Sequence, residues 1–358
     1  MSTSREKALI ALSGGVDSTV AAAILKDRGF HVEGFYMKNG FPGKSETEAR
    51  SAADKLRISL HVTDLTDPFR KEIVDYFVAE YLSGRTPNPC VLCNKKIKFF
   101  YLMKLAEQFG FGHVATGHYA RIENLGGKYG YRIRKGIDTK KDQSYFLSRL
   151  GQEELGKIIF PHGNSTKEEV KEMAAKIGFG SLAQKESQEI CFIPNNYRDF
   201  LEKYSQESLP QPGNIVSLQG QIVGRHQGIH SVTIGQRKGL DISSDRPYYV
   251  LEIRKDTNEV VVVRDEDQFF GGLIAKDISW VSPAYLSSKD IEARVHIRYR
   301  HRGVDSTIVK HTSDGEGNSA LVTFEKPQKA VAPGQAAVFY QGDIVIGGGW
   351  IERGIKLD

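Results

Sequence analysis

The chain has 358 residues, of which 40% are hydrophobic and 26% are charged, and its formal net charge is +5. This length predicts two or three domains, and the composition is that of a soluble globular protein with an ample core. No stretch is long enough to cross a membrane and the N-terminus does not resemble a signal peptide, so we expect a cytoplasmic protein without a membrane partner. The mild positive charge permits a nucleic-acid partner without requiring one.

Strands and helices alternate in the first half of the chain. The expected strands are residues 8–12, 30–37, 58–62 and 113–117, and the expected helices are 19–28, 45–56 and 67 to about 84. Ser45 and Glu48 have the spacing of a capping box, which begins the second helix. Repeated β–α units predict an α/β domain with a parallel sheet, whose ligands bind at the carboxyl ends of the strands.

The pattern changes after about Pro210, where helical periodicity gives way to short alternating runs separated by turn residues. Such runs occupy 248–253, 259–263, 293–299 and 336–340. They predict a small β-rich domain followed by a closed or half-closed β-barrel. The expected domains are therefore 1–205 for the α/β unit, 206–272 for the central β-rich unit and 273–358 for the barrel.

A glycine-rich hexapeptide, Ser-Gly-Gly-Val-Asp-Ser at 13–18, connects the first strand to the first helix. Its adjacent glycines let backbone N–H groups approach an anion, and the helix N-terminus adds unpaired donors and the positive end of its dipole. Ser13 and Ser18 can donate to phosphate oxygens, and Asp17 can hold a magnesium ion. The hexapeptide is neither a Walker A motif nor G-x-G-x-x-G. It resembles the PP-loop of ATP pyrophosphatases, which cleave ATP to AMP and pyrophosphate and adenylate a substrate oxygen.

Three cysteines in a chain of this size argue against a disulfide scaffold and in favour of chemistry or incidental burial. Cys90 and Cys93 form a C-x-x-C pair in a loop with two prolines, and Cys191 lies much further along the chain. The pair alone fits zinc, redox chemistry or coincidence, but no second close pair completes a zinc site. We expect Cys93 to lie at or near a helix start beside the lysines at 95–98, which would lower its pKa and make it a nucleophile.

Together these motifs resemble those of bacterial tRNA 2-thiouridylases, PP-loop enzymes that replace the C2 oxygen of the wobble uridine by sulfur. The resemblance runs nearly from end to end. It is carried by residues 13–18, 86–99, 116–121, 141–147, 187–194, 226–228, 233–240 and 333–340. So many matches in one order are more specific than any single motif.

The resemblance implies where ATP, magnesium and the anticodon stem-loop of tRNA bind. ATP would contact Ala11, Leu12, Ser13, Gly14, Gly15, Val16, Asp17, Ser18, Met37 and Gly117, with Asp17 also holding the magnesium ion. The tRNA would contact Asn88, Pro89, Cys90, His118, Lys141, Asp142, Gln143, Arg298, Tyr299 and Gln335. The wobble uridine would leave the anticodon stack and attack ATP through its C2 oxygen.

The resemblance also implies a route for sulfur. Cys191 would carry a persulfide received from a sulfur-carrier protein, and Cys93 would release the product by forming a transient disulfide with Cys191, so a reductant is needed. Cys90 departs from the family, many members of which carry an aspartate there as a candidate acid–base group. The alternative is that Cys90, Cys93 and Cys191 hold a [4Fe–4S] cluster whose open iron takes up sulfide, as in related tRNA thiolases. The sequence leaves both routes open.

A basic segment at 128–149 interleaves cations with aromatic residues and is expected to face RNA. Residues 141–143 in this segment and 298–302 in the barrel match tRNA-contacting positions of the family. Two rival classes explain less of the chain. An amidotransferase-coupled PP-loop synthetase accounts for the phosphate loop but not for the cysteines or the β-rich tail, and a non-catalytic tRNA-binding protein would not need an intact phosphate loop. We expect a monomer.

Overall fold

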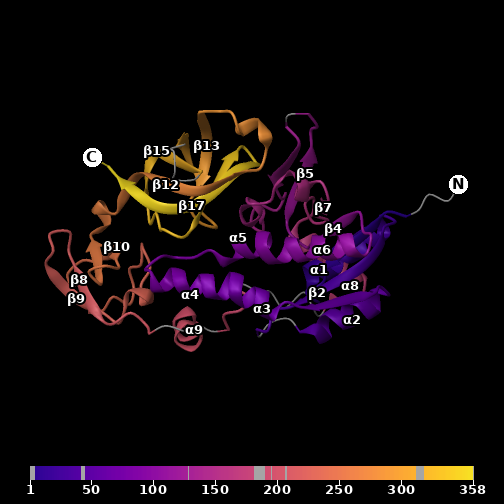
Figure 1. Cartoon of the computed structure of the whole chain (residues 1–358), viewed down its shortest axis with the longest axis horizontal. Coiled ribbons are helices and arrows are strands. Elements are labelled where there is room, and N and C mark those ends of the chain that lie inside the picture. Colours follow the sequence, from indigo (N-terminus) through magenta and orange to yellow (C-terminus); the bar gives the residue numbers. More distant parts are fainter. Residues whose placement is uncertain are drawn as a thin grey trace.

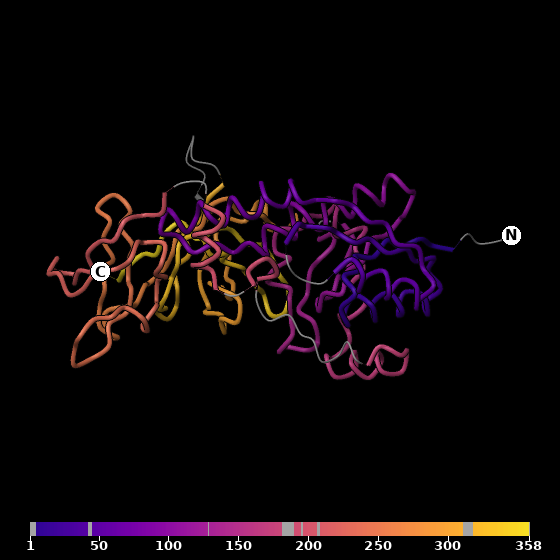
Figure 2. Tube along the Cα trace, turned by 90° about the horizontal axis from the view of Figure 1, so that it is seen from below, coloured from indigo at the N-terminus to yellow at the C-terminus, as the bar shows by residue number. Residues whose placement is uncertain are grey.

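The computed structural model describes residues 5–41, 45–127, 129–180, 190–194, 196–205, 208–311 and 318–357. The molecule is elongated, with the N-terminal α/β unit at one end, the central β unit at the other and the barrel above the long helices between them (Figures 1 and 2). None of the described helices combines the length and the apolar content that a bilayer crossing needs.

Five of the described strands form a parallel sheet in the order β3-β2-β1-β4-β7, which confirms the predicted α/β class. They are β1 Lys7–Ala11, β2 His31–Lys38, β3 Leu60–Asp64, β4 His113–Ala115 and β7 Ile158–Ile159. The β1 residues Ala8, Leu9 and Ile10 are completely buried, as expected for a central strand covered on both faces. Strand β4 ends two residues before its predicted end, because Thr116 and Gly117 leave the sheet to line a pocket.

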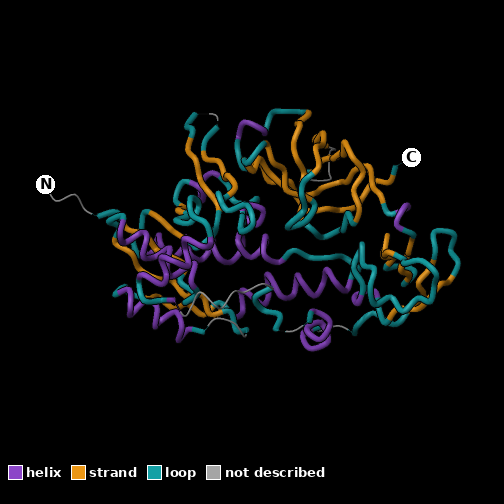
Figure 3. Tube along the Cα trace, turned by 180° about the vertical axis from the view of Figure 1, so that it is seen from behind, coloured by secondary structure: helices purple, strands orange, loops and turns teal. Residues whose placement is uncertain are grey.

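Two long helices, each interrupted by a π-helical turn, run side by side beneath the barrel (Figures 1 and 3). The first comprises α3 Thr66–Phe69, η1 Arg70–Val74 and α4 Asp75–Leu82, and the second α5 Pro89–Cys93, η2 Asn94–Phe99 and α6 Phe100–Gln108. The helices nearer the sheet are α1 Val16–Asp27, α2 Glu46–Leu56 and α8 Lys167–Lys176. The predicted capping box of α2 is confirmed, with both hydrogen bonds between Ser45 and Glu48 present.

A hairpin that the sequence analysis did not predict joins the α/β unit to the barrel. Its strands are β5 Ala120–Asn124 and β6 Tyr131–Lys135. They stand beside the barrel (Figure 3), and β6 pairs antiparallel with the barrel strand β17, Ile344–Lys356. Just before β17, the Asp343 carboxylate accepts hydrogen bonds from Arg121 at 2.7 Å and Arg134 at 3.0 Å. The two units therefore share a sheet as well as an interface.

Six of the described strands close into the predicted barrel, in the order β12-β15-β14-β13-β16-β17, with β12 pairing back to β17. They are β12 Phe269–Trp280, β13 Asp290–His296, β14 Val304–His311, β15 Ser319–Lys329, β16 Ala336–Gln341 and β17. Strand β13 lies earlier than the predicted 293–299, because the chain turns after His296 and Arg300 adopts a φ of 66°.

The central unit is a smaller sheet in the order β10-β11-β8-β9. Its strands are β8 Gly213–Val216, β9 Ile222–His226, β10 Tyr249–Arg254 and β11 Glu259–Val263. The remaining described helical segments are α7 Gln152–Leu155, α9 Tyr197–Tyr204, η3 Ser144–Leu147, η5 Ile229–Ser231, η6 Asp265–Asp267 and η7 Pro283–Tyr285.

One hydrophobic core continues from the α/β unit into the barrel. It contains Phe77 and Leu102 of the long helices together with Val338, Tyr340 and Val345 of the barrel, each at most 1% exposed. Close-packed interiors resist displacement of their parts. The shared core therefore fixes the barrel relative to the long helices.

Candidate active site

The phosphate-binding loop joins β1 to α1 and is held in shape by its own hydroxyl groups. The Ser18 hydroxyl donates to the carbonyl oxygen of Gly15 at 3.0 Å and accepts from the backbone N–H of Ser13 at 3.2 Å. Among the described residues, no side chain caps α1 at Gly15. The first N–H groups of the helix therefore remain available to an anion.

Two glycines allow other segments to approach this loop closely. Gly14 has a φ of +75°, and a Cβ there would lie 2.5 Å from the backbone carbonyl carbon of Glu48. At Gly117 a Cβ would lie 2.8 Å from the carbonyl carbon of Asp17 and 2.9 Å from the nitrogen of Ser18. Real Cβ atoms do not approach backbone so closely, so any side chain at either position would displace the loop.

Asp17 is fixed by residues that sequence reasoning did not assign. Its Oδ1 accepts from the Tyr119 hydroxyl at 2.7 Å and from Nζ of Lys167 at 2.6 Å, and only 5% of the Lys167 side chain is exposed. Nε2–H of His162 donates to the Asp17 carbonyl oxygen at 2.6 Å. These partners lie 102 to 150 residues from Asp17, so local patterns could not reveal them. Tyr119 alone stood in a motif, the one at 116–121.

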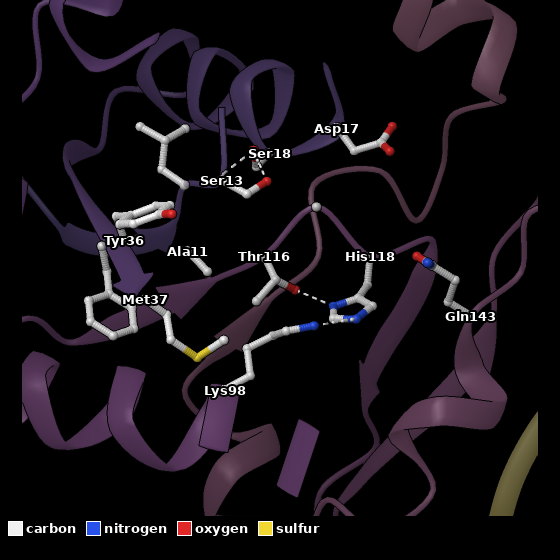
Figure 4. Close-up of a pocket in the computed structure, with 13 residues that line it drawn as sticks. Ala11, Ser13, Asp17, Ser18, Tyr36, Met37, Lys98, Thr116, His118 and Gln143 are labelled. Atoms are coloured by element: carbon white, nitrogen blue, oxygen red, sulfur yellow. Dashed lines mark hydrogen bonds between the residues drawn. The ribbon is translucent and has the colours of Figure 1, made fainter. Parts of the chain in front are cut away.

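An open pocket of about 260 Å³ lies beside the loop, at the carboxyl ends of β1, β2 and β4 (Figure 4). The predicted ATP contacts that line it are Ala11, Leu12, Ser13, Asp17, Ser18, Met37 and Gly117. Those that do not are Gly14, Gly15 and Val16. Two predicted tRNA contacts, His118 and Gln143, also line the pocket, as do the unassigned Phe35, Tyr36, Lys98 and Thr116.

A magnesium ion at this loop would depend on the nucleotide for most of its ligands. Among the described residues, no group of three or more His, Cys, Asp or Glu side chains is placed to hold a metal ion. Mg²⁺ is commonly bound by one or two carboxylates together with substrate phosphates and water. Asp17, which lines the pocket, is a suitable single protein ligand of that kind.

Cys90 and Cys93 lie on the short helix α5, which Asn88 caps with its side chain. Pro89 is the first helical residue, so Cys90 is in the first turn and Cys93 is the last residue of α5. Cys93 thus lies near the start of the long helix that α5 begins, as predicted, but the prediction that its pKa is lowered is wrong. Burial raises the pKa of Cys93 to about 12 and that of Cys90 to about 11, and this desolvation outweighs the opposite effect of Lys98.

Cys191 lies on an exposed turn that the next residue anchors. Phe192 is 1% exposed, and its ring lies with a centroid separation of 5.2–5.9 Å from the rings of Phe41, Phe69, Phe77 and Phe200. The Cys191 side chain reaches solvent, but neighbouring protein desolvates the thiolate and raises its pKa. Residues 187–189 of the motif predicted at 187–194 lie outside the described residues.

The three thiols are free and act on one another electrostatically. Beyond burial, the main cause of the raised pKa values, Cys191 raises the pKa of Cys90 and Cys93, whereas the Lys98 ammonium lowers the pKa of all three. Such effects decay with distance, so the three groups lie near one another. In the described part of the chain they nevertheless do not form a metal-binding group, so this conformation does not fit a [4Fe–4S] cluster.

Comparison with known proteins gives a family for this arrangement. The tRNA methyl transferase HUP domain family matches residues 6–195, the tRNA methyl transferase PRC-barrel domain family 198–264 and the aminomethyltransferase beta-barrel domain family 270–351. The chain is 49% identical to tRNA-specific 2-thiouridylase MnmA 2 of Syntrophus aciditrophicus, over 91% of this chain and 100% of the relative. It is 42% identical to tRNA-specific 2-thiouridylase MnmA of Carboxydothermus hydrogenoformans, over 98% of each. The chain belongs to the tRNA-specific 2-thiouridylase family.

Solved structures resemble this member of the 2-thiouridylase family only weakly. A 4-thiouridine synthetase–RNA complex with bound ATP gives a TM-score of 0.33 at 23% identity, covering 56% of this chain and 50% of that chain. A likeness of this size is too low to inform the site.

In this member of the 2-thiouridylase family, the barrel holds the segment that precedes the cysteine pair. The backbone N–H of Thr86 donates to the carbonyl oxygen of Pro333 at 2.8 Å. Nε2 of Gln335 donates to the carbonyl oxygens of Thr86 at 3.1 Å and Pro87 at 3.0 Å. Figure 1 shows this extended segment passing beneath β17 to reach α5. Gln335, predicted to contact tRNA, therefore contacts the segment at 83–88 between α4 and α5, which we call the cysteine loop.

Residues 141–143 reach the pocket through Gln143, whose Oε1 accepts from the backbone N–H of Tyr119 at 3.0 Å. The Asp142 carboxylate accepts from the Ser144 hydroxyl at 2.8 Å. Burial raises the Asp142 pKa despite these hydrogen bonds. The lysine of this tripeptide is half-buried. Two of the three predicted tRNA contacts thus also shape the protein beside the pocket.

Part of the basic segment predicted to face RNA is used inside the protein. Arg134 forms an ion pair with Asp343 at 3.0 Å, and Nζ of Lys135 lies 4.3 Å from the ring centroid of Tyr340. Tyr145 is only 3% exposed. These side chains fasten the hairpin and the following turn to the barrel, so they are poorly placed to contact RNA.

The other predicted tRNA contacts lie in different environments. Asn88 and Pro89 are buried beside Cys90. In the barrel, Arg298 is exposed, whereas the ring of Tyr299 packs on Phe146 with a centroid separation of 4.4 Å. Of these, Arg298 is the one best placed to contact a phosphate.

Replacing Gln335 by alanine should loosen the cysteine loop. The change removes two hydrogen bonds to the loop, each worth about 1 kcal/mol. A loss of about 2 kcal/mol makes opening of the loop roughly 30-fold more frequent, so iodoacetamide should alkylate Cys90 and Cys93 roughly 30-fold faster. Mass spectrometry of the modified peptides gives the rates. Gln341→Ala is the matched control, because Gln341 donates to Glu292 within the barrel. Equal rates in both variants would contradict the prediction.

Proposed function

We propose that this chain is an ATP-dependent tRNA-uridine 2-sulfurtransferase, which replaces the C2 oxygen of the wobble uridine by sulfur. The observation that carries this proposal is the contiguity of two sites. One side chain, Lys98, lines the pocket of the phosphate-binding loop and also acts electrostatically on all three cysteines. Relatives that cover 91–98% of the chain are named tRNA-specific 2-thiouridylases, which supports the same reaction.

In the first step, the uridine C2 oxygen attacks the α-phosphorus of ATP, and the bond to the leaving pyrophosphate breaks. Backbone N–H groups of the loop at 13–18 and the N-terminus of α1 would bind the phosphates. A magnesium ion held by Asp17 and the phosphates would offset charge on the leaving group. The products are the O-adenylated base and pyrophosphate.

In the second step, the outer sulfur of a Cys191 persulfide attacks C2, and the C2–O bond breaks as AMP leaves. The Cys93 thiolate then attacks the Cys191 sulfur, forming a Cys93–Cys191 disulfide and leaving the outer sulfur on C2 as thiouridine. A dithiol reductant returns the disulfide to two thiols, so each turnover consumes two electrons. We prefer this route to a [4Fe–4S] cluster, because the three thiols do not form a metal-binding group in the described conformation.

The proposed function also requires a surface on which the tRNA binds. The tRNA anticodon stem-loop would approach across Arg298 and Tyr299 of the barrel and place its uridine near His118 and Gln143, which line the pocket. Cys90 lies in the first turn of α5, where many family members carry aspartate. We further propose a cytoplasmic monomer supplied by a sulfur carrier, with domains 1–205, 206–272 and 273–358.

The test is nucleoside mass spectrometry of unthiolated tRNA after anaerobic incubation with the protein, ATP and magnesium. One batch receives a persulfide donor and a dithiol, and a second receives sulfide after reconstitution of the protein with iron. We expect 2-thiouridine in the first batch. Thiolation only in the second would replace the persulfide route by the cluster. Thiouridine in neither would contradict the proposed function.

A further inference from the structure

Lys98 lies on the π-helical turn η2, between the cysteine helix α5 and the pocket. A π-helical turn closes its hydrogen bond between residues i and i+5, so it brings Lys98 back toward Cys93. In a regular α-helix, residues five apart face different directions. The π-helical turn therefore places the Lys98 side chain near both the pocket and the thiols.

The Lys98 ammonium points into the pocket toward His118 (Figure 4). Its Nζ lies 3.5 Å from Nε2 of His118, and Nδ1 of the same ring lies 2.7 Å from Oγ1 of Thr116. Burial and Lys98 lower the pKa of His118 well below its usual value, so the ring is neutral. An ammonium group can only donate, so Nε2 accepts and Nδ1–H donates to Thr116.

Lys98 supplies a positive charge to the pocket. Among the described lining residues, Lys98 is the sole lysine or arginine, and His118 is uncharged. The Lys167 ammonium, which does not line the pocket, is paired with the Asp17 carboxylate at 2.6 Å. Among the described lining residues, Lys98 is therefore the cation that can stabilise negative charge developing between the loop and the cysteines.

We propose that Lys98 is a catalytic residue in both halves of the reaction. During adenylation its ammonium stabilises the negative charge that builds on the α-phosphoryl oxygens as the uridine oxygen attacks and pyrophosphate leaves. During sulfur transfer the same ammonium stabilises the phosphate oxygen that departs with AMP, and it attracts the incoming sulfur anion. Lys98 stays protonated throughout, so no proton needs to be supplied or removed. This inference rests on the proposed function.

The test compares Lys98→Gln, which removes the charge, with Lys98→Arg, which keeps it. Lys104→Gln is the control, because Lys104 is an exposed lysine on α6 of the same long helix. The first readout is tRNA-dependent exchange of labelled pyrophosphate into ATP, which reports adenylation alone. The second is the single-turnover rate of thiouridine formation from a preformed persulfide. Thermal unfolding and the Kd for ATP show whether each variant is folded.

Loss of one preorganised charged donor commonly costs about 100-fold in rate, so Lys98→Gln should slow both exchange and thiolation about 100-fold at little change in Tm. Lys98→Arg should recover at least tenfold of that loss, which a purely structural role would not produce. Exchange and thiolation in Lys98→Gln equal to those of Lys104→Gln would overturn the inference, and so would a loss that Lys98→Arg does not recover. A wild-type protein that forms no thiouridine would instead overturn the proposed function, and the inference with it.

Discussion

Replacing Cys191 or Cys93 by serine should abolish thiouridine formation and leave ATP binding unchanged. A serine oxygen cannot carry a sulfane sulfur in place of Cys191, and it cannot attack a disulfide bond in place of Cys93. Neither cysteine lines the nucleotide pocket, so the Kd for ATP should stay within about twofold of the wild-type value. Nucleoside mass spectrometry and calorimetric titration with an ATP analogue measure the two quantities.

Cys90→Ser provides the comparison, because Cys90 shares the helix and the burial of Cys93 but has no step in the persulfide route. We expect it to keep measurable thiolation. If it loses all activity together with the other two variants, the cluster route becomes the better account. Full thiolation by Cys93→Ser or Cys191→Ser would contradict both sulfur mechanisms.

The raised thiol pKa values add a pH dependence to this experiment. The pKa of Cys93 is raised to about 12, so the thiol is mostly protonated at neutral pH. Below the pKa, each unit of pH raises the thiolate fraction about tenfold. Alkylation of Cys93 in the resting wild-type protein should therefore still rise steeply between pH 8 and pH 10. A plateau in that interval would mean that Lys98 outweighs burial.

Patterns close together in the sequence were enough to predict much of the fold. The hexapeptide at 13–18 follows a buried strand and begins a helix, and Ser45 caps the next helix through a residue three positions away. Such contacts are local, so residue type and spacing determine them. The parallel sheet followed from repetition of these units.

Features that depend on distant contacts could not be predicted in this way. The shift of the Cys93 pKa was predicted in the wrong direction, because the sequence shows the nearby lysines but does not show the burial of α5. The hydrogen bond from Gln335 to Thr86 joins residues 249 positions apart in the sequence. The ion pair of Lys167 with Asp17 joins residues 150 positions apart. The barrel and helix α8 thus complete a site whose reactive groups are all in the first half of the chain or just beyond it.

The close approach of Gly117 to the phosphate-binding loop should make Gly117→Ala a damaging substitution at the nucleotide site. The added Cβ would lie 2.8–3.0 Å from the backbone of Asp17 and Ser18, inside normal contact distance. That backbone forms the first turn of α1, whose N–H groups would bind the anion in the proposed reaction. The loop can relieve the contact only by moving, and then its donors no longer converge.

A hydrogen bond to a charged group contributes about 1.5–3 kcal/mol, so loss of one donor should weaken ATP binding by roughly 10- to 100-fold. The clash should also lower the free energy of unfolding by about 1–3 kcal/mol. Calorimetric titration with an ATP analogue and urea denaturation measure the two effects. Gly112→Ala is the control, because Gly112 lies just before β4 and a Cβ there meets nothing within 4 Å. Wild-type affinity for ATP in Gly117→Ala would show that the nucleotide does not depend on this loop geometry, and the phosphate site would then have to lie elsewhere.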